Sequence, residues 1–147
     1  MGFSLTGTHV VFFVAAVIVA GTVSGVFIAV TTNITSSLSE KGKRISEQID
    51  TEFKIINDPI NIPLISGNYL FYLKNIGNNK ITTTNETFQI FIDGEIISKI
   101  NYSFTDDTIS PSEYTIIRIS QSLINSGYHN IKLIGPYSTD EEFIFEV

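Results

Sequence analysis

The stretch that decides the fold is Val10 to Val30, which reads VVFFVAAVIVAGTVSGVFIAV. Its twenty-one residues carry no charge, and no Asp, Glu, Lys or Arg occurs before Glu40. At about 1.5 Å per residue, a helix of this length measures about 31 Å, enough to cross a hydrocarbon core of about 30 Å. A secretory signal peptide begins with Lys or Arg residues, and residues 1–9 contain neither. The sequence therefore predicts a retained transmembrane helix over about residues 10–30.

The helix is predicted to continue beyond the membrane as a stalk. After Val30 the apolar residues Ile34, Leu38, Ile45 and Ile49 recur at spacings of four or seven, which places them on one side of a helix. An exposed helix with such a stripe favours packing against a partner helix. We divide the chain into residues 1–52, the transmembrane helix and stalk, and residues 53–147, an extracytoplasmic β domain.

Small residues within the membrane segment strengthen the expectation of a helix partner. Gly21 and Gly25 form a GxxxG pair, a spacing that lets two membrane helices approach closely. A second row of small residues consists of Ala16, Ala20 and Ser24. The candidate helix–helix interface residues are Gly21, Gly25, Leu38, Ile45 and Ile49. Contact with lipid and packing within the chain are the alternative interpretations of each.

The rest of the chain alternates between apolar and polar residues with period two, the pattern of half-buried strands. We expect about seven short strands, at 53–56, 69–73, 88–92, 95–104, 114–119, 128–134 and 142–147. Asp93-Gly94 favours a type I′ turn, so segments 88–92 and 95–104 are predicted to form a hairpin. We expect one face of the return strand of this hairpin to carry Ile96, Ile100, Tyr102 and Phe104.

About seven strands separated by turns are typical of a two-sheet sandwich of immunoglobulin-like type. In the last predicted strand Phe143, Phe145 and Val147 are expected to face inward, with Glu142 and Glu146 outward. The predicted fold is a single N-terminal transmembrane α-helix followed by an all-β immunoglobulin-like sandwich.

The sequence offers little for catalysis or metal binding. It has no Cys and two His residues. His129 lies in a predicted strand with no Ser or Cys nucleophile at a recognisable spacing, so we interpret it as a histidine of the core or sheet edge. Asp106-Asp107 offer oxygen ligands of the kind Ca²⁺ takes, but a solvated loop explains them better. We predict no catalytic residue, no cofactor, no metal and no small-molecule substrate.

Charge and sequence motifs bear on the location of the β domain. A net charge of -6 argues against binding to nucleic acid, which requires a basic face. Three N-glycosylation sequons begin at Asn33, Asn85 and Asn101, all after the membrane segment. Lys41, Lys43 and Arg44 follow the helix, and the positive-inside rule taken alone would keep the C-terminal part in the cytoplasm. The sandwich type, the sequons and the acidic domain favour the outside, which is our prediction.

The layout resembles the archaeal flagellin-like proteins, and within them the archaellum accessory (stator) proteins. The likeness rests on Phe12–Val26, Ile55–Pro59, Tyr69–Gly77 and Phe91–Ile97, and it is closer to the FlaG type than to the FlaF type. The opening Met1–Ser4 is more similar to the FlaF type. The motifs are apolar and structural, and they span most of the chain.

The resemblance implies a non-enzymatic structural component of the archaellum, the rotary swimming filament of archaea. It implies a single-pass anchor in the cytoplasmic membrane and a β domain beneath the surface layer. The implied partners are a second copy of the chain, the companion stator protein, and the surface-layer protein, directly or through the companion. The alternatives are a minor filament subunit of the flagellin or pilin kind, and a generic membrane-anchored surface protein that binds a ligand.

Overall fold

The N-terminal third of the chain forms one uninterrupted helix. The computed structural model describes residues 2–147, with side chains from Thr6 onward. Helix α1 spans Gly2–Asp50, and Gly42 does not interrupt it. Within the described residues from Thr6, α1 is long and apolar enough to cross a membrane, which agrees with the predicted span in length and composition. The chain divides into two compact units after Lys43, so residues 44–50 of α1 belong to the same unit as the strands.

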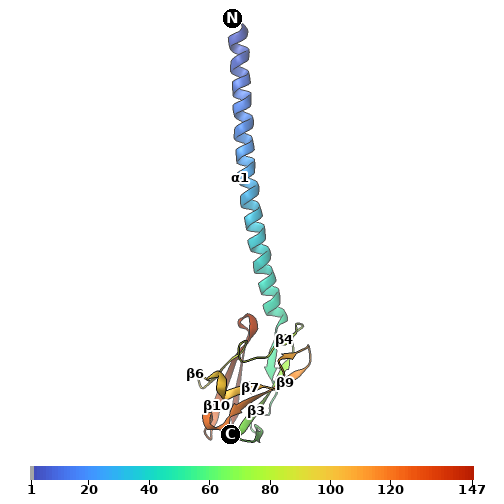
Figure 1. The fold of residues 1–147 in the computed structure, drawn as a ribbon, viewed down its shortest axis with the longest axis vertical. Coiled ribbons are helices and arrows are strands. Elements are labelled where there is room, and N and C mark those ends of the chain that lie inside the picture. The colour runs from blue at the N-terminus through green and yellow to red at the C-terminus, as the bar shows by residue number, and fades with distance from the viewer. Residues whose placement is uncertain (1) are drawn as a thin grey trace. The chain divides into compact units, whose positions relative to one another are not determined.

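Two antiparallel sheets form the β sandwich, and the predicted fold class is confirmed (Figure 1). The first sheet has the order β1-β3-β9-β7, with β2 also on β3; the bounds are β1 Phe53–Ile55, β2 Leu64–Ile65, β3 Asn68–Asn75, β7 Tyr102–Phe104 and β9 Tyr114–Ser120. The second sheet has the order β11-β10-β5-β6, with β5 Gln89–Ile92, β6 Glu95–Ile96, β10 Tyr128–Ile134 and β11 Asp140–Glu146. A separate ladder joins β4 Ile81–Thr82 to β8 Thr108–Ile109.

The core lies between the sheets and is held by pairs of aromatic rings. Phe71 of β3 packs edge-to-face on Phe145 of β11, with ring centroids 5.0 Å apart. Phe53 of β1 packs in the same way on Phe88, at 5.1 Å. Each pair joins a residue of the first sheet to one in or next to the second, so burial of these rings stabilises the sandwich as a whole. As predicted, Phe143, Phe145 and Val147 pack in or against the core.

The predicted return strand 95–104 is wrong. The hairpin exists, with Phe91 opposite Ile96, but β6 ends after two residues. The chain then passes through the short 3₁₀ helix η1, Lys99–Asn101, and enters the first sheet as β7. Ile96 and Ile100 are exposed whereas Tyr102 is buried, so these three residues do not share a face. The crossover occurs because Ile97, rather than Ile96, is buried, and its N–H donates to the Ile90 carbonyl.

The Asn57 side chain takes the place of a neighbouring strand at one point along β3. Its side-chain amide donates to the Leu70 carbonyl at 2.8 Å, and the Tyr72 N–H donates to its Oδ1 at 2.7 Å. The side chain therefore satisfies two groups of the β3 backbone at the point between its pairings with β1 and β2. This contact fixes the turn at Asn57-Asp58-Pro59.

The carboxyl end of α1 is held by the loop that follows β3. The N–H groups of Asn78 and Asn79 donate to the Asp50 carbonyl at 2.8 and 3.0 Å, and those of Ile76 and Gly77 donate to the Glu52 carbonyl. A Cβ added at Gly77 would lie 2.5 Å from the Asp50 carbonyl oxygen and 2.6 Å from the Glu52 nitrogen. Only glycine allows the loop to approach the helix end this closely.

The loop is itself fixed by a buried asparagine. The Asn75 side chain is fully buried; its amide donates to the Asn79 and Ile109 carbonyls, and its Oδ1 accepts from the Gly77 N–H. One side chain thus satisfies three backbone groups, two in the β3–β4 loop and one in β8. Residues 75–79 therefore serve to hold the end of α1 on the sandwich.

Gly77→Ala is expected to lower the free energy of unfolding of the β domain by about 1–3 kcal/mol, because the new methyl group overlaps two backbone atoms that cannot move independently. Urea unfolding followed by tyrosine fluorescence measures the change, since the chain has no Trp and all six Tyr lie after residue 68. Gly42→Ala is the matched control, since nothing lies within 4 Å of its added Cβ. An unchanged midpoint for Gly77→Ala would contradict the assigned role of this glycine.

Candidate interaction surfaces

The residues proposed for helix packing lie on two different sides of α1. An α-helix turns by about 100° per residue, so Ile34, Leu38, Ile45 and Ile49 lie within about 60° of one another around its axis. All four side chains are exposed. Gly21 and Gly25 lie about 100° and 140° around the helix from Leu38, and an added Cβ at either would meet nothing within 4 Å. The stripe and the glycine pair are therefore separate surfaces.

The second row of small residues falls on the same side as the stripe. Ala16, Ala20 and Ser24 lie within about 80° of Ile34 by the same rotation. One continuous side of α1 therefore presents small residues in the predicted membrane span and large apolar residues in the stalk. This side is the longer of the two candidate surfaces.

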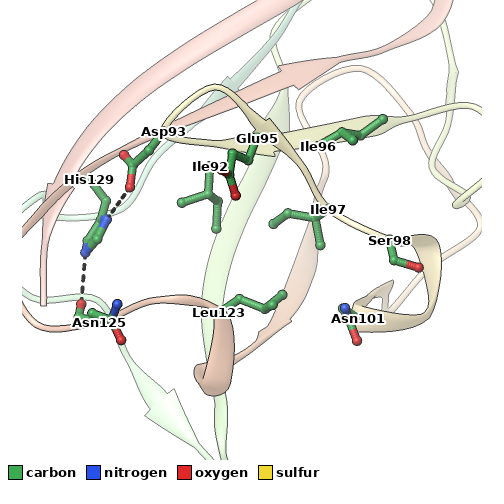
Figure 2. Close-up of a pocket in the computed structure, with 10 residues that line it drawn as sticks. All are labelled: Ile92, Asp93, Glu95, Ile96, Ile97, Ser98, Asn101, Leu123, Asn125 and His129. Atoms are coloured by element: carbon green, nitrogen blue, oxygen red, sulfur yellow. Dashed lines mark hydrogen bonds and ion pairs between the residues drawn. The ribbon is translucent and has the colours of Figure 1, made fainter.

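A pocket of about 570 Å³ opens on the β domain between the β5–β6 hairpin, η1 and the 3₁₀ helix η2, Gln121–Leu123 (Figure 2). Figure 2 shows Ile92, Ile97 and Leu123 in the middle of this pocket, between His129 on one side and Ser98 and Asn101 on the other. The pocket thus has an apolar centre and polar ends.

The hairpin turn is tied to β10 by Asp93. Its Oδ2 lies 2.6 Å from His129 Nδ1, and its Oδ1 accepts from the Asn130 N–H at 2.9 Å. Asp93 has a φ of 52°, as the predicted Asp-Gly turn requires of its first central residue. The Asp-Gly turn therefore places the Asp93 carboxylate within hydrogen-bonding distance of β10.

His129 bridges two acceptors. Its Nε2 lies 2.9 Å from the Asn125 carbonyl oxygen, while Nδ1 faces the Asp93 carboxylate. Neither partner has a proton to donate, so only the doubly protonated imidazolium makes both hydrogen bonds. The hydrogen bond to Asp93 raises the pKa of His129. The bond from the Asn130 N–H, followed by that to His129, lowers the pKa of Asp93.

Comparison with known proteins identifies the family. The archaeal-type flagellin family matches residues 2–142. The chain belongs to the archaeal-type flagellin family. The resemblance inferred from the sequence is therefore confirmed.

Two proteins similar to this chain carry the same name. Flagella-related protein G of Methanocaldococcus jannaschii is 33% identical over 135 residues, which cover 87% of this chain and 86% of the relative. Flagella-related protein G of Methanococcus voltae is 27% identical over 145 residues, 95% of each chain. The likeness to these relatives thus includes the apolar helix as well as the strands.

A solved structure shares the fold. The archaellum periplasmic stator protein FlaG from Sulfolobus acidocaldarius superposes with a TM-score of 0.51 at 19% identity, covering 65% of this chain and 99% of that one. At this identity the likeness concerns the fold, and it supports the immunoglobulin-like arrangement of the sheets.

Sequence reasoning on this flagellin-type chain missed the pocket and the Asp93–His129 contact. The Asp93-Gly94 turn was a clear signal, but nothing in the sequence pairs Asp93 with a residue 36 positions later. The contact follows from the pairing of β5 with β10, which brings Ile92 opposite Ile131. His129 therefore lies in an inner strand of the second sheet, just beyond the pairing of β10 with β5, and it has a specific structural partner.

The three sequons lie in different environments, and their glycosylation remains a prediction. Asn33 is exposed on α1. The Asn85 amide donates to the Lys99 and Tyr102 carbonyls at 2.8 and 3.0 Å, so a glycan there would displace two hydrogen bonds. Asn101 is half-buried at the edge of the pocket.

The Asp106-Asp107 loop is held by hydroxyl groups. The Asp106 carboxylate accepts from the Thr105 and Thr115 hydroxyls. Among the residues that the structure describes, no group of three His, Cys, Asp or Glu side chains is placed to hold a metal ion.

The β domain is expected to lose stability as the pH rises above about 6.5. Because the pKa of His129 is raised in the folded state, its contribution is fully present below its unfolded value of 6.5 and is lost as pH rises through the folded value. Asp93 has a lowered pKa, so its contribution is present above 3.8 and is lost as pH falls through the folded value.

Asp93→Asn should flatten this pH dependence, since Asn tolerates the left-handed turn but carries no charge. Urea midpoints by tyrosine fluorescence between pH 5 and 8.5 give the profile. Asp107→Asn, in an exposed loop, should keep the parent profile. Parallel profiles for the parent chain and Asp93→Asn would show that this ion pair does not set the slope.

Proposed function

We propose that this chain is a non-enzymatic, membrane-anchored structural component of the archaellum motor, a stator or assembly protein that links the cytoplasmic membrane to the cell envelope. The observation that carries the proposal is the combination, in one chain of the archaeal-type flagellin family, of a 49-residue helix with a long apolar segment and an immunoglobulin-like sandwich. The names of the relatives, flagella-related protein G and archaellum periplasmic stator protein, support the same role.

The junction between α1 and the strands suits a protein that resists force. The last turns of the helix are part of the β-domain unit, and the Asp50 carbonyl is capped by two backbone N–H groups rather than left to solvent. The end of α1 at Asp50 thus cannot separate from the sandwich without breaking these hydrogen bonds. A load on the domain is passed to the helix backbone, and this task requires no catalytic group.

In this proposal residues 1–52 form the anchor and stalk, with the membrane span at about 10–30, and residues 53–147 lie outside the cytoplasmic membrane under the surface layer. The acidic character of the domain supports the outer location, because the chain from Asp58 onward contains eleven acidic and five basic residues. The proposed partners are a second copy or the companion stator protein. The surface-layer protein is reached directly or through that companion.

The stripe of Leu38, Ile45 and Ile49 is our proposed contact with a partner helix, and Gly21 and Gly25 form a second contact on a different side of α1. Each stripe side chain is more than half exposed, at 64%, 56% and 73%. Two separate sides allow two different helices to be bound at once. A single partner helix would contact the stripe and the Ala16, Ala20 and Ser24 row.

Cysteine crosslinking tests the stripe, because the chain has no Cys of its own. Leu38→Cys and Ile45→Cys in native membranes are expected to form disulfide-linked species under mild oxidation, and the mass of the product distinguishes a second copy from the companion. Glu40→Cys, about 160° around the helix from Leu38, is the control.

Gly25→Leu should leave the Leu38→Cys crosslink intact if the two sides act independently. Equal crosslinking at Glu40→Cys and Leu38→Cys would instead indicate random collision in the membrane, and the proposed contact would be withdrawn.

Deletion of the chain and restoration with a C-terminally tagged copy test the proposed function. Loss of swimming on deletion and its recovery with the tagged chain are expected. In the restored cells, after gentle loosening of the surface layer, added protease should remove the tag. A tag protected until lysis would place the β domain in the cytoplasm, and swimming that survives deletion would exclude a required motor role.

A minor filament subunit is the second candidate, because the family that matches residues 2–142 is named for flagellins. Recovery of the chain with sheared filaments, in amounts that follow the filament protein, would favour it. Retention of the chain in the membrane fraction after shearing favours the stator proposal.

A further inference from the structure

The pocket lies at the end of the sandwich opposite the attachment of α1. Gly135 packs directly against the ring of Phe53, the first residue of β1, so the carboxyl end of β10 is next to the attachment. Along β5, Gln89 pairs with Ile134 at that end, whereas Ile92 pairs with Ile131 farther away. The Asp93-Gly94 turn therefore reaches the far end of the domain.

The apolar surface of the pocket continues outside it. Ile92 and Ile97 are buried, Leu123 is 39% exposed and Ile96 is 62% exposed. Ile100 of η1 is 89% exposed, and none of the three residues of η1 is buried. Large apolar side chains left in water next to a concave surface favour a protein contact.

The pocket contains a negatively charged side chain that has no partner among the described residues. Asp93 is already bound by His129 and by the Asn130 N–H. Glu95 has no hydrogen bond or ion pair among the described residues, and Figure 2 shows its side chain pointing into the pocket beside Ile92. No Lys or Arg lines the pocket in the described part of the chain. A positively charged group is therefore attracted and a carboxylate is repelled.

The walls of the pocket are held in place before anything binds. The Asn85 amide donates to two carbonyls at the ends of η1, Lys99 and Tyr102. Lys99 also pairs with Glu86 at 2.6 Å. On the opposite wall the Gln121 N–H donates to the Gly67 carbonyl. A pre-arranged pocket loses little conformational entropy on binding.

We propose that this pocket receives an arginine side chain from a protein partner of the cell envelope, an inference that rests on the proposed function in placing the domain outside. The aliphatic part of the arginine lies along Ile92, Ile97 and Leu123, and its guanidinium meets the Glu95 carboxylate. Arginine fits better than lysine because its planar group donates several hydrogen bonds at once, and Ser98 and Asn101 offer further side-chain oxygens. Ile96 and Ile100 contact apolar residues that flank the arginine.

The test uses the full chain in lipid nanodiscs, with isoleucine and leucine methyl groups labelled for NMR. The probe is the peptide acetyl-Ala-Arg-Ala-amide. We expect saturable shifts at Ile97 and Leu123. The same peptide with citrulline, which has the shape of arginine without its charge, should bind about tenfold more weakly.

Two variants with matched controls locate the site. Glu95→Gln is expected to weaken binding about tenfold, whereas Asp107→Asn, an exposed acid elsewhere in the domain, leaves it unchanged. Leu123→Ala should weaken binding, and Ile144→Ala, which removes an exposed apolar side chain from β11, should not. The unchanged methyl spectrum of Glu95→Gln outside the pocket checks that the variant is folded.

Equal binding of the arginine and citrulline peptides would overturn the proposal, as would full binding by Glu95→Gln or shifts confined to other parts of the domain. Swimming separates this outcome from failure of the proposed function. If deletion abolishes swimming but Glu95→Gln cells swim normally and the probe does not bind, the motor role stands and the arginine site falls. If deletion leaves swimming intact, the motor role falls whatever the peptide does.

Discussion

The capping of the Asp50 carbonyl by the N–H groups of Asn78 and Asn79 is the interaction on which the rest of the structure depends. The last carbonyl groups of a helix have no hydrogen-bond partner within the helix. A long apolar helix does not by itself determine how the next domain attaches to it. Here the β3–β4 loop supplies those partners, Gly77 provides the space for its approach, and Asn75 fixes the loop from within the core. The end of the helix is consequently built into the sandwich rather than tethered to it.

The two ends of the β domain have different tasks. At the end next to Phe53, the loop that contains Gly77 closes on the end of α1 through backbone hydrogen bonds. The far end carries the pocket, with Asp93 and His129 tying the hairpin to β10 and Glu95 left without a partner in the described chain. Between them, the edge-to-face rings of Phe71 and Phe145 keep the sheets together. Such a division suits a protein that is anchored at one end and makes contact at the other.

The elements that were predictable are those whose pattern is local. An uncharged run of twenty-one residues, period-two strands such as 128–134 and the Asp93-Gly94 turn each depend on neighbouring residues alone. The break after Ile96 was not predictable, because apolar residues continue through Phe104 and only the packing of Ile97 against the core shows where the strand ends. The pocket was not predictable for the same reason, since its walls come from segments about thirty residues apart.

The sequence by itself determined a membrane-length helix, an all-β domain of immunoglobulin-like type, and membership of the archaeal flagellin-like proteins. It could do so because hydropathy, strand period and family motifs each depend on residues that are close together in the sequence. It also determined that the stalk stripe and the GxxxG pair occupy different sides of the helix, since helical rotation follows from spacing. Only the tertiary structure decided which loop receives the helix, that His129 meets Asp93, and that Glu95 of the pocket has no partner among the described residues. These depend on which strands pair and in what register, and register joins residues that no local pattern connects.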